Sequence, residues 1–365
     1  MVYEKKELPL TSRERIKAVF GHVQPDRTPI FEYILLSPVA DVILGRAYAG
    51  EPDYWCGLLK EKGWEDAVKQ IALDRLELAC ILGHDMMWVP PNPLPTDTVG
   101  FSFPSSEDLA DDPVGVQTRR NERYAEKPRG PRDDTLLVYR ILKNQMQQRG
   151  IDLPILADAV EHGIWTDVNL MATMVLAPEV AHRHFELATE RSLASIERYT
   201  SLGLDAIIIG GDFAGNTLLI SPEAYEEFIV PQLRILSRRI HEAGTYAINA
   251  SDGNLWPVID DFLLSSKVDG YLEIDQYAGM DLRKLKHRYG DKITFLGNLD
   301  CGNLLSFGTS DQIRRHVIEC LEAGMGNGGH IFCASNAIVK SIPLSNYLTV
   351  INTYREVFSL PKIAF

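Results

Sequence analysis

Apolar runs that end in a polar side chain recur through the second half of the chain. Five of them are DAIIIGGD to Asp212, YAINASD to Asp252, VDGYLEID to Asp275, ITFLGNLD to Asp300 and HIFCASN to Asn336. Such runs are typical of strands buried on both faces, as in a parallel sheet covered by helices. The C-terminal ends of parallel strands meet on one face, where these folds place their active sites. The pattern therefore predicts where the site lies.

Three earlier segments, PIFEYI, DMMWVP and LPILADAV, extend this series to eight predicted strands, each followed by a helical pattern. Thr11 and Glu14 form a T-x-x-E capping box that starts an additional N-terminal helix. Eight β/α units in one chain of this length favour a (β/α)8 TIM barrel over an open doubly wound sheet. We therefore expect a single α/β barrel domain over residues 1–365.

Residues 92–132, after the second predicted strand, interrupt this alternation. They are rich in proline, glycine and acids and show little periodicity. The short alternating segment GFSFP favours a hairpin strand within them. Loops this long in compact domains commonly serve as lids or binding loops. We therefore expect a lid or insertion within the barrel domain.

Composition narrows the classes of partner. The net charge of −13, without a compensating basic stripe, argues against a nucleic-acid or anionic-membrane surface. The five cysteines are scattered, odd in number and without CxxC spacing, which suits free thiols in a reducing compartment. No apolar run approaches the roughly 18 residues of a membrane span, and the first residues do not resemble a signal peptide. We expect a cytoplasmic protein without a nucleotide cofactor.

The aspartates at the strand ends have two interpretations. Together in one pocket they would provide a general acid, ligands for a cation or polar contacts to a substrate. Each is equally suited to cap the helix that follows it. Asp275 and Asp300 fit the capping interpretation about as well as the functional one. Asp252, which Gly253 follows, is the stronger functional candidate.

Other candidate residues also have structural alternatives. Glu161 and His162 follow a predicted strand, with Trp165 just beyond, and suit a proton shuttle or a metal site as well as an ordinary loop contact. Cys333 is either a site thiol or a small buried apolar residue. Glu32 is costly to bury without a partner, so we expect it to face the pocket. His330 starts a strand, away from the expected site, and is expected to be structural.

Several motifs together resemble the uroporphyrinogen decarboxylase superfamily. They are SRERIKAVFGHVQPDRTPI, ISPEAYEEFIVPQLRIL, SDGNLWPVIDDFL, AGMDLRKLKHRYGDKITFLGNLDC and GGHIFCASNAI followed by PLSNYL. The resemblance covers nearly the whole chain and rests on the order and spacing of these motifs. It implies a single TIM barrel with its pocket at the C-terminal strand ends. The superfamily includes porphyrinogen decarboxylases and corrinoid-dependent methyltransferases.

The chain departs from both branches at their characteristic positions. Where decarboxylases resemble one another in an Arg-Gln-Ala-Gly-Arg segment, it reads Phe31-Glu32-Tyr33-Ile34-Leu35, and their strand-two aspartate is replaced by Trp88-Val89-Pro90-Pro91. Where the zinc-dependent methyltransferases show His-x-Cys, it reads Ala250-Ser251-Asp252, and their later cysteine falls at or near Asn336. Carboxylate ligands suit harder ions better than zinc.

The resemblance favours a methyltransferase-like enzyme that takes a methyl group from a small methoxy or methylamine-type donor and passes it to a corrinoid protein. It implies catalytic roles for Asp252, Glu161 and His162. Substrate contacts are expected from Glu32, Trp165, Asp212, Asn249, Asn254, Asn298 and Asn336. A divalent metal, zinc or a harder ion, would bind to Asp252, Glu161, His162 and Cys333. A decarboxylase or lyase and a non-catalytic ligand-binding barrel are the alternatives, and a homodimer is a family expectation.

Overall fold

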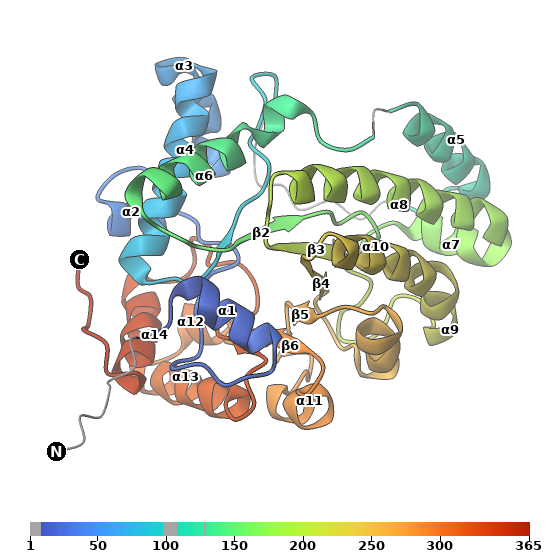
Figure 1. Ribbon diagram of the computed structural model, residues 1–365. Helices are drawn as coiled ribbons and strands as arrows, with labels where there is room; N and C mark the ends of the chain where they lie inside the picture. The colour runs from blue at the N-terminus through green and yellow to red at the C-terminus, as the bar shows by residue number, and fades with distance from the viewer. Residues whose placement is uncertain (1–8, 98–107, 128) are drawn as a thin grey trace.

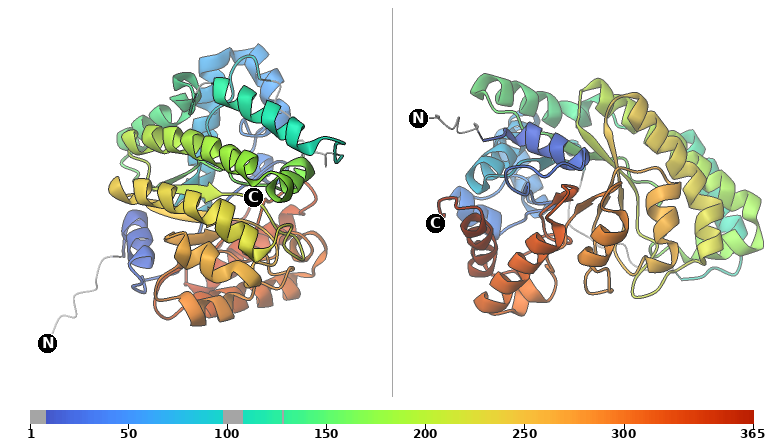
Figure 2. Two further views of the ribbon diagram at one scale, coloured as in Figure 1. Left: turned by 90° about the vertical axis from the view of Figure 1, so that its right-hand side faces the viewer. Right: turned by 60° about the horizontal axis from the view of Figure 1, so that its bottom comes forward.

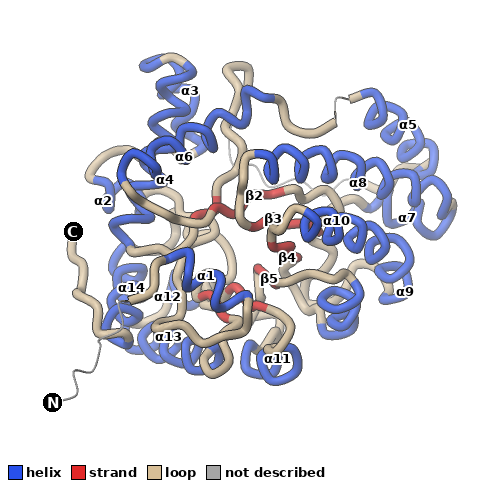
Figure 3. The backbone as a smooth tube through the Cα atoms, in the orientation of Figure 1, coloured by secondary structure: helices blue, strands red, loops and turns tan. Residues whose placement is uncertain are grey.

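A parallel sheet of seven strands lies at the centre of the protein. The computed structural model describes residues 9–97, 108–127 and 129–365. All neighbouring strands are parallel and follow one another in chain order from β1 to β7. The strands are β1 (Met87–Trp88), β2 (Ile155–Asp158), β3 (Ala206–Gly210), β4 (Tyr246–Ala250), β5 (Gly270–Leu272), β6 (Thr294–Leu296) and β7 (His330–Ile331). Figure 3 shows them at the centre of the backbone.

Helices form the outer layer around this sheet (Figures 1 and 2). The α-helices are α1 (Ser12–Phe20), α2 (Val39–Leu44), α3 (Trp55–Lys62), α4 (Trp64–Leu82), α5 (Pro113–Glu126), α6 (Leu137–Arg149), α7 (Val168–Leu176), α8 (Pro178–Ser201), α9 (Pro222–Ala224), α10 (Val230–Glu242), α11 (Leu282–Tyr289), α12 (Leu304–Phe307), α13 (Ser310–Gly324) and α14 (Leu344–Val357). Short 3-10 and π-helical turns are η1 (Pro52–Tyr54), η2 (Asp133–Leu136), η3 (Tyr225–Ile229), η4 (Trp256–Val258) and η5 (Asp261–Ser265). The predicted Thr11 capping box of α1 is confirmed.

The first predicted strand is present only as an isolated bridge. Ile30 pairs with Phe332, and the amide of Phe31 donates to the Phe332 carbonyl at 3.2 Å. On the other side, the Asp85 amide, two residues before β1, donates to the Ile30 carbonyl at 2.7 Å. This segment therefore bonds both to the chain after β7 and to the chain before β1. The fold is TIM-barrel-like with seven strands, so the predicted count of eight is not confirmed.

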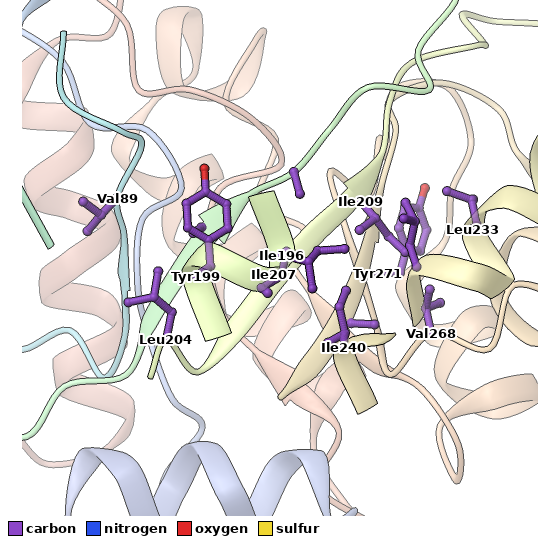
Figure 4. Close-up of a cluster of buried hydrophobic side chains, with 14 of the residues drawn as sticks. Val89, Ile196, Tyr199, Leu204, Ile207, Ile209, Leu233, Ile240, Val268 and Tyr271 are labelled. Atoms are coloured by element: carbon purple, nitrogen blue, oxygen red, sulfur yellow. The ribbon is translucent and has the colours of Figure 1, made fainter. Parts of the chain in front are cut away.

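Both faces of the sheet are buried, as the continuous apolar runs predicted. Ile207 and Ile209 of β3 face outward against α8 and α10, where Ile196 and Leu233 belong to the same apolar cluster (Figure 4). The alternate residue Ile208 faces inward and belongs to a separate inner cluster with Leu156 and other residues of the neighbouring strands. Burying each such side chain contributes roughly 1.5–3 kcal/mol. This two-sided packing fixes which residues reach the interior at each strand end.

Residues 92–132 contain a helix that the sequence pattern did not predict. Helix α5 packs against α7 and α8, on the right of Figure 1. The GFSFP segment lies outside the described residues, so the hairpin stays a prediction. In the part of the chain that the structure describes, no helix has both the length and the apolar character that a bilayer crossing requires.

A buried carboxylate joins the segments that precede the barrel strands. Asp85 is fully buried and accepts hydrogen bonds from the Arg27 guanidinium at 2.6 and 2.8 Å, from Arg15 at 3.2 Å and from the Ile30 amide at 3.1 Å. Removing one partner of a buried ion pair leaves the other charges uncompensated. Asp85 therefore holds the first β/α segments in place.

We expect Asp85→Ala to lower the free energy of unfolding by about 3–5 kcal/mol, because two arginines lose their buried partner. Equilibrium urea denaturation measures this difference. Asp53→Ala, at an exposed position, is the matched control and should change stability by less than about 0.5 kcal/mol. Equal midpoints for the two variants would contradict the role given to Asp85.

Candidate active site

A cavity of about 850 Å³ opens at the C-terminal ends of the strands. Its lining comes from segments that follow β2, β3, β4, β5, β6 and β7, together with Tyr33 from the bridged first segment. Its acidic lining residues are Asp158, Asp212, Asp252, Glu273, Asp275 and Asp300. The cavity is thus where the runs of apolar residues predicted it.

Strand alternation brings most of these acids into the interior. Successive side chains of a strand point to opposite faces, so residues two apart share a face. Asp158 follows the inward Leu156 by two positions, and Asp252 follows the inward Ile248 by four. Glu273 directly follows the inward Leu272 and has a φ of 71°, so the alternation ends there. The turn at Glu273 brings its carboxyl into the cavity.

Asp252 lies between two polar contacts. The side-chain amide of Asn336 donates to its Oδ2 at 2.7 Å, and its own backbone N–H donates to Asp212 Oδ1 at 3.0 Å. Burial, and then the charges of Asp212 and Asp275, raise the pKa of Asp252 to about 7. A carboxyl group with such a pKa holds a proton near neutral pH and releases it readily, as a general acid must.

The neighbouring acids are shifted in the same direction. Burial raises the pKa of Asp158 to about 7, although the indole N–H of Trp88 donates to its Oδ2 at 2.8 Å. Burial also raises the pKa of Asp212. The pKa of Glu273 lies well above its usual value because of burial and then of the charges on Asp252, Asp212 and Asp158. All four pKa values are therefore shifted toward the protonated form, and those of Asp158 and Asp252 lie at about 7.

The cavity lacks basic side chains. No lysine, arginine or histidine among the described residues lines it. Arg75 lies nearby but behind Trp88, with its guanidinium carbon 5.5 Å from the indole ring centre, and lines a separate small cavity. Aromatic side chains do line the main cavity, from Tyr33, Trp165 and Tyr277. The lining is therefore acidic and aromatic.

Asp275 and Asp300 line the cavity but also stabilise turns. Asp300 accepts hydrogen bonds from the backbone amides of Gly302, Asn303 and Leu304 at 3.0 to 3.2 Å. Asp275 accepts one from the Ala278 amide at 3.0 Å. Asp300 therefore stabilises the turn that leads into α12, whose N-cap residue is Asn303, and Asp275 has a comparable structural role.

Of the predicted site residues, the structure brings Asp252, Asp212, Trp165 and Asn336 together in the cavity. Glu161 and His162 do not line it. Glu161 is bonded to the Tyr124 hydroxyl of α5 and lies 3.5 Å from the Arg191 guanidinium of α8. His162 is buried, its Nε2 lies 2.9 Å from the Thr189 hydroxyl, and burial lowers its pKa to about 3.

Three predicted asparagines also lie outside the cavity lining. Asn249 is buried on the outer face of β4 and donates to the Phe262 carbonyl at 3.0 Å. Asn298 donates to the Met280 carbonyl at 3.3 Å and lines a different cavity. The Asn254 side chain accepts from the Trp256 amide at 3.2 Å. All three make local structural contacts.

Glu32 and Cys333 correct two further expectations. Glu32 does not face the main cavity but lines the small cavity beside Arg75 and His84. Its neighbour Tyr33 lines the main cavity instead. Burial raises the pKa of Glu32 to about 8, despite a hydrogen bond from the Ala334 amide. Cys333 is fully buried within the inner apolar cluster, and burial raises the pKa of its thiol. The small-apolar interpretation of Cys333 fits this environment.

A zinc site of the family type does not fit this chain. The position of the His-x-Cys motif holds Ala250, Ser251 and Asp252, so it offers no imidazole and no thiolate. Across the described residues, no group of three or more His, Cys, Asp or Glu side chains is arranged to hold a metal ion. Glu161, His162 and Cys333 do not meet Asp252 in one site, so they cannot replace the missing ligands together.

The sequence pattern did not identify Asp158, Tyr33, Glu273 or Tyr277 as cavity residues. Asp158 is detectable, because it lies two positions after Leu156 in a buried strand and follows the inward register. The direction of the Tyr33 side chain could not be predicted, because it depends on the register of a segment that forms only one bridge. Glu273 carried no signal, because its direction depends on the backbone turn at its own φ.

Comparisons with known proteins show which proteins the chain resembles. The family model described as "Uroporphyrinogen decarboxylase (URO-D)" matches residues 162–357, more than half of the chain. A uroporphyrinogen decarboxylase of Synechocystis sp. is 21% identical over 286 residues, covering 73% of this chain and 77% of the relative. A methylated-thiol–coenzyme M methyltransferase of Methanosarcina mazei is 25% identical over 179 residues, covering 49% of this chain and 45% of that protein.

The solved structures agree on the fold. A methyltransferase from Methanosarcina mazei superimposes with a TM-score of 0.68 and 18% sequence identity, covering 96% of this chain and 99% of that structure. The similar proteins thus include both decarboxylases and methyltransferases. The chain belongs to the uroporphyrinogen decarboxylase family.

Proposed function

We propose that this protein is a methyltransferase-like enzyme, which removes a methyl group from a small methylated donor and passes it to a corrinoid protein. One observation carries the proposal: four carboxyl groups with raised pKa values line the cavity, and no basic side chain of the described residues joins them. Such a site suits a reaction that needs a proton donor and a substrate without several negative charges.

Demethylation needs an acid at the leaving atom. The bond from the methyl carbon to oxygen or nitrogen breaks, and its electron pair stays on the leaving atom, which must take up a proton. Asp252 is the donor that the geometry favours, because Asn336 holds its carboxyl at the cavity. A reduced corrinoid on a partner protein would supply the nucleophile for the methyl group. The remaining acids disfavour anions near the leaving atom.

The cavity supports the decarboxylase alternative less well. A porphyrinogen carries several carboxylates, and binding it beside Asp158, Asp212, Asp252 and Glu273 would place like charges together without compensation. No arginine of the described residues lines the cavity. Decarboxylation therefore has the support of the sequence relatives but not of the lining. A purely ligand-binding role predicts no turnover and is decided by the same assay.

The test is methyl transfer from methoxy and methylamine donors to reduced cobalamin, followed by the absorbance of methylcobalamin. With methoxy donors, which need a proton at the leaving oxygen, we expect turnover to be greatest below about pH 7 and to fall as pH rises through about 7, because Asp158 and Asp252 then lose their protons. Absence of transfer across such a panel, with release of carbon dioxide from a carboxylate panel, would favour the decarboxylase alternative. Absence of both would favour the binding role.

A further inference from the structure

We propose that the donor binds as a cation, an N-methylated ammonium ion held between the cavity carboxylates and its aromatic side chains. The inference rests on the proposed function, since it names the class of donor that the same cavity accepts. It selects nitrogen over oxygen as the leaving atom. Three observations support the inference: the acidic lining without basic side chains among the described residues, an unpaired carboxylate oxygen, and the aromatic side chains of the cavity.

The charges of the cavity are unbalanced. Asp158, Asp212, Asp252, Glu273 and Asp275 line one space, and among the described residues no lysine, arginine or histidine shares that lining. Several carboxyl groups so close together must stay partly protonated unless a cation lies among them. An ammonium ion would remove this repulsion and allow the acids to ionise. A neutral or anionic ligand would not.

One carboxylate oxygen of a cavity residue lacks a partner. Oδ1 of Asp158 is buried and has no hydrogen-bond partner within the described residues, although Oδ2 is bonded to Trp88. A buried polar atom without a partner is uncommon in native proteins and calls for a missing one. The carboxyl group of Glu273 lines the same cavity. Both groups can accept from an N–H donor or pair with a quaternary nitrogen.

Aromatic rings complete the binding surface for a methylated cation. Tyr33 lies against Trp88, with ring centres 5.0 Å apart, and lines the cavity beside the acids. Trp165 and Tyr277 line it too, with 49% and 74% of their surface exposed. Aromatic faces attract alkylated ammonium groups, which are poorly hydrated and too bulky for close hydrogen bonding. The lining therefore suits methylated ammonium ions better than a metal ion.

The same contact would prepare the donor for demethylation. A neutral methylamine would have to leave as an amide anion, which is a very poor leaving group. A methylamine takes up its proton in water, because it is a stronger base than the carboxylates, and ionised cavity carboxyl groups such as Asp252 then pair with the ammonium ion. When the carbon–nitrogen bond then breaks, its electron pair stays on nitrogen and a neutral amine leaves with that proton. A permanently quaternary donor leaves as a neutral amine without this step.

Three ligands of one shape test the inference: choline, its uncharged carbon isostere dimethylbutanol, and the dimethylbutanoate anion. Isothermal titration calorimetry in the presence of EDTA measures each affinity without a contribution from metal ions. We expect choline to bind at least roughly tenfold more tightly than dimethylbutanol, a difference of about 1.4 kcal/mol, and the anion more weakly than both. Equal affinities, or preference for the anion, would overturn the inference.

Substitutions show whether the cavity is responsible. Glu273→Gln and Asp158→Asn should each weaken choline binding several-fold and leave dimethylbutanol binding unchanged. Glu226→Gln removes the same charge from an exposed position and should change neither. If one cavity variant fails to fold, the other carries the test. An unchanged affinity of a folded cavity variant for choline would overturn the inference.

The inference and the proposed function can fail separately. Selective choline binding without methyl transfer from any donor would retain the cation site and remove the methyltransferase. Transfer from methyl ethers, with no preference for choline over dimethylbutanol, would retain the methyltransferase and remove the cation site.

Discussion

With a methyl ether as donor, Asp252→Asn should lower the rate of methyl transfer by roughly 10²–10⁴-fold, the usual contribution of a positioned general acid. Asparagine has nearly the same shape, and its amide oxygen can still accept the hydrogen bond from Asn336 that Oδ2 of Asp252 accepts at 2.7 Å. It cannot give up a proton to the leaving atom. Single-turnover formation of methylcobalamin, measured with enzyme in excess, separates this step from donor binding.

The pH profile distinguishes loss of an acid from loss of shape. The wild-type rate should fall above about pH 7, where Asp252 ionises, whereas the residual rate of the variant should depend much less on pH. Asp291→Asn, at an exposed position, should behave as wild type. A variant that retains the wild-type rate and profile would remove Asp252 from the acid role and leave Asp158 and Glu273 as the candidates.

Glu32→Gln should stabilise the protein at alkaline pH. In the folded state the pKa of Glu32 is raised to about 8 by burial, against 4.5 for its ordinary value. Between these values the unfolded chain loses the proton and the folded chain retains it, so stability falls as pH rises from about 4.5 to about 8. The full loss is on the order of 3–5 kcal/mol, and glutamine, which does not ionise, avoids it.

Thermal unfolding at about pH 5 and about pH 9 measures this effect. The gain in midpoint from Glu32→Gln should be small at the lower pH and largest at the higher one. Glu65→Gln, at an exposed position, serves as the control and should show no such dependence. Equal differences between variant and wild type at both pH values would show that Glu32 is not a buried neutral acid. Methyl transfer should be retained, since Glu32 lies outside the main cavity.

Much of the fold was predictable because burial on both faces leaves a continuous apolar signal. The runs ending at Asp212, Asp252, Asp275, Asp300 and Asn336 all contain strands of the sheet. The first segment was not predictable to the same degree. Its sequence PIFEYI mixes apolar and polar residues on both faces, so neither its single bridge nor its register could be read from the pattern.

A site residue was predictable where the strand itself sets the direction of its side chain. Asp252 continues the inward alternation of β4, Asp212 follows β3 after two glycines with positive φ, and the two acids meet in the cavity as expected. Glu161 lies beyond the end of β2, where the turn rather than the strand sets its direction, and it meets α5 and α8 instead. Proximity to a strand end in sequence therefore locates the region but not the direction of a side chain.

The four acids with raised pKa values lie at the ends of four consecutive strands, β2 to β5, and each is supplied by a different β/α unit. Parallel pairing holds these strands in register, so an acid such as Asp158 or Glu273 can be exchanged without moving the strand that carries it, whereas Asp212 and Asp252 are joined by a hydrogen bond. The charge selectivity of the cavity can consequently be changed one residue at a time. Single substitutions that add or remove one charge at a time would form a stepwise path between a site for cations and a site for anions, in evolution as in protein engineering.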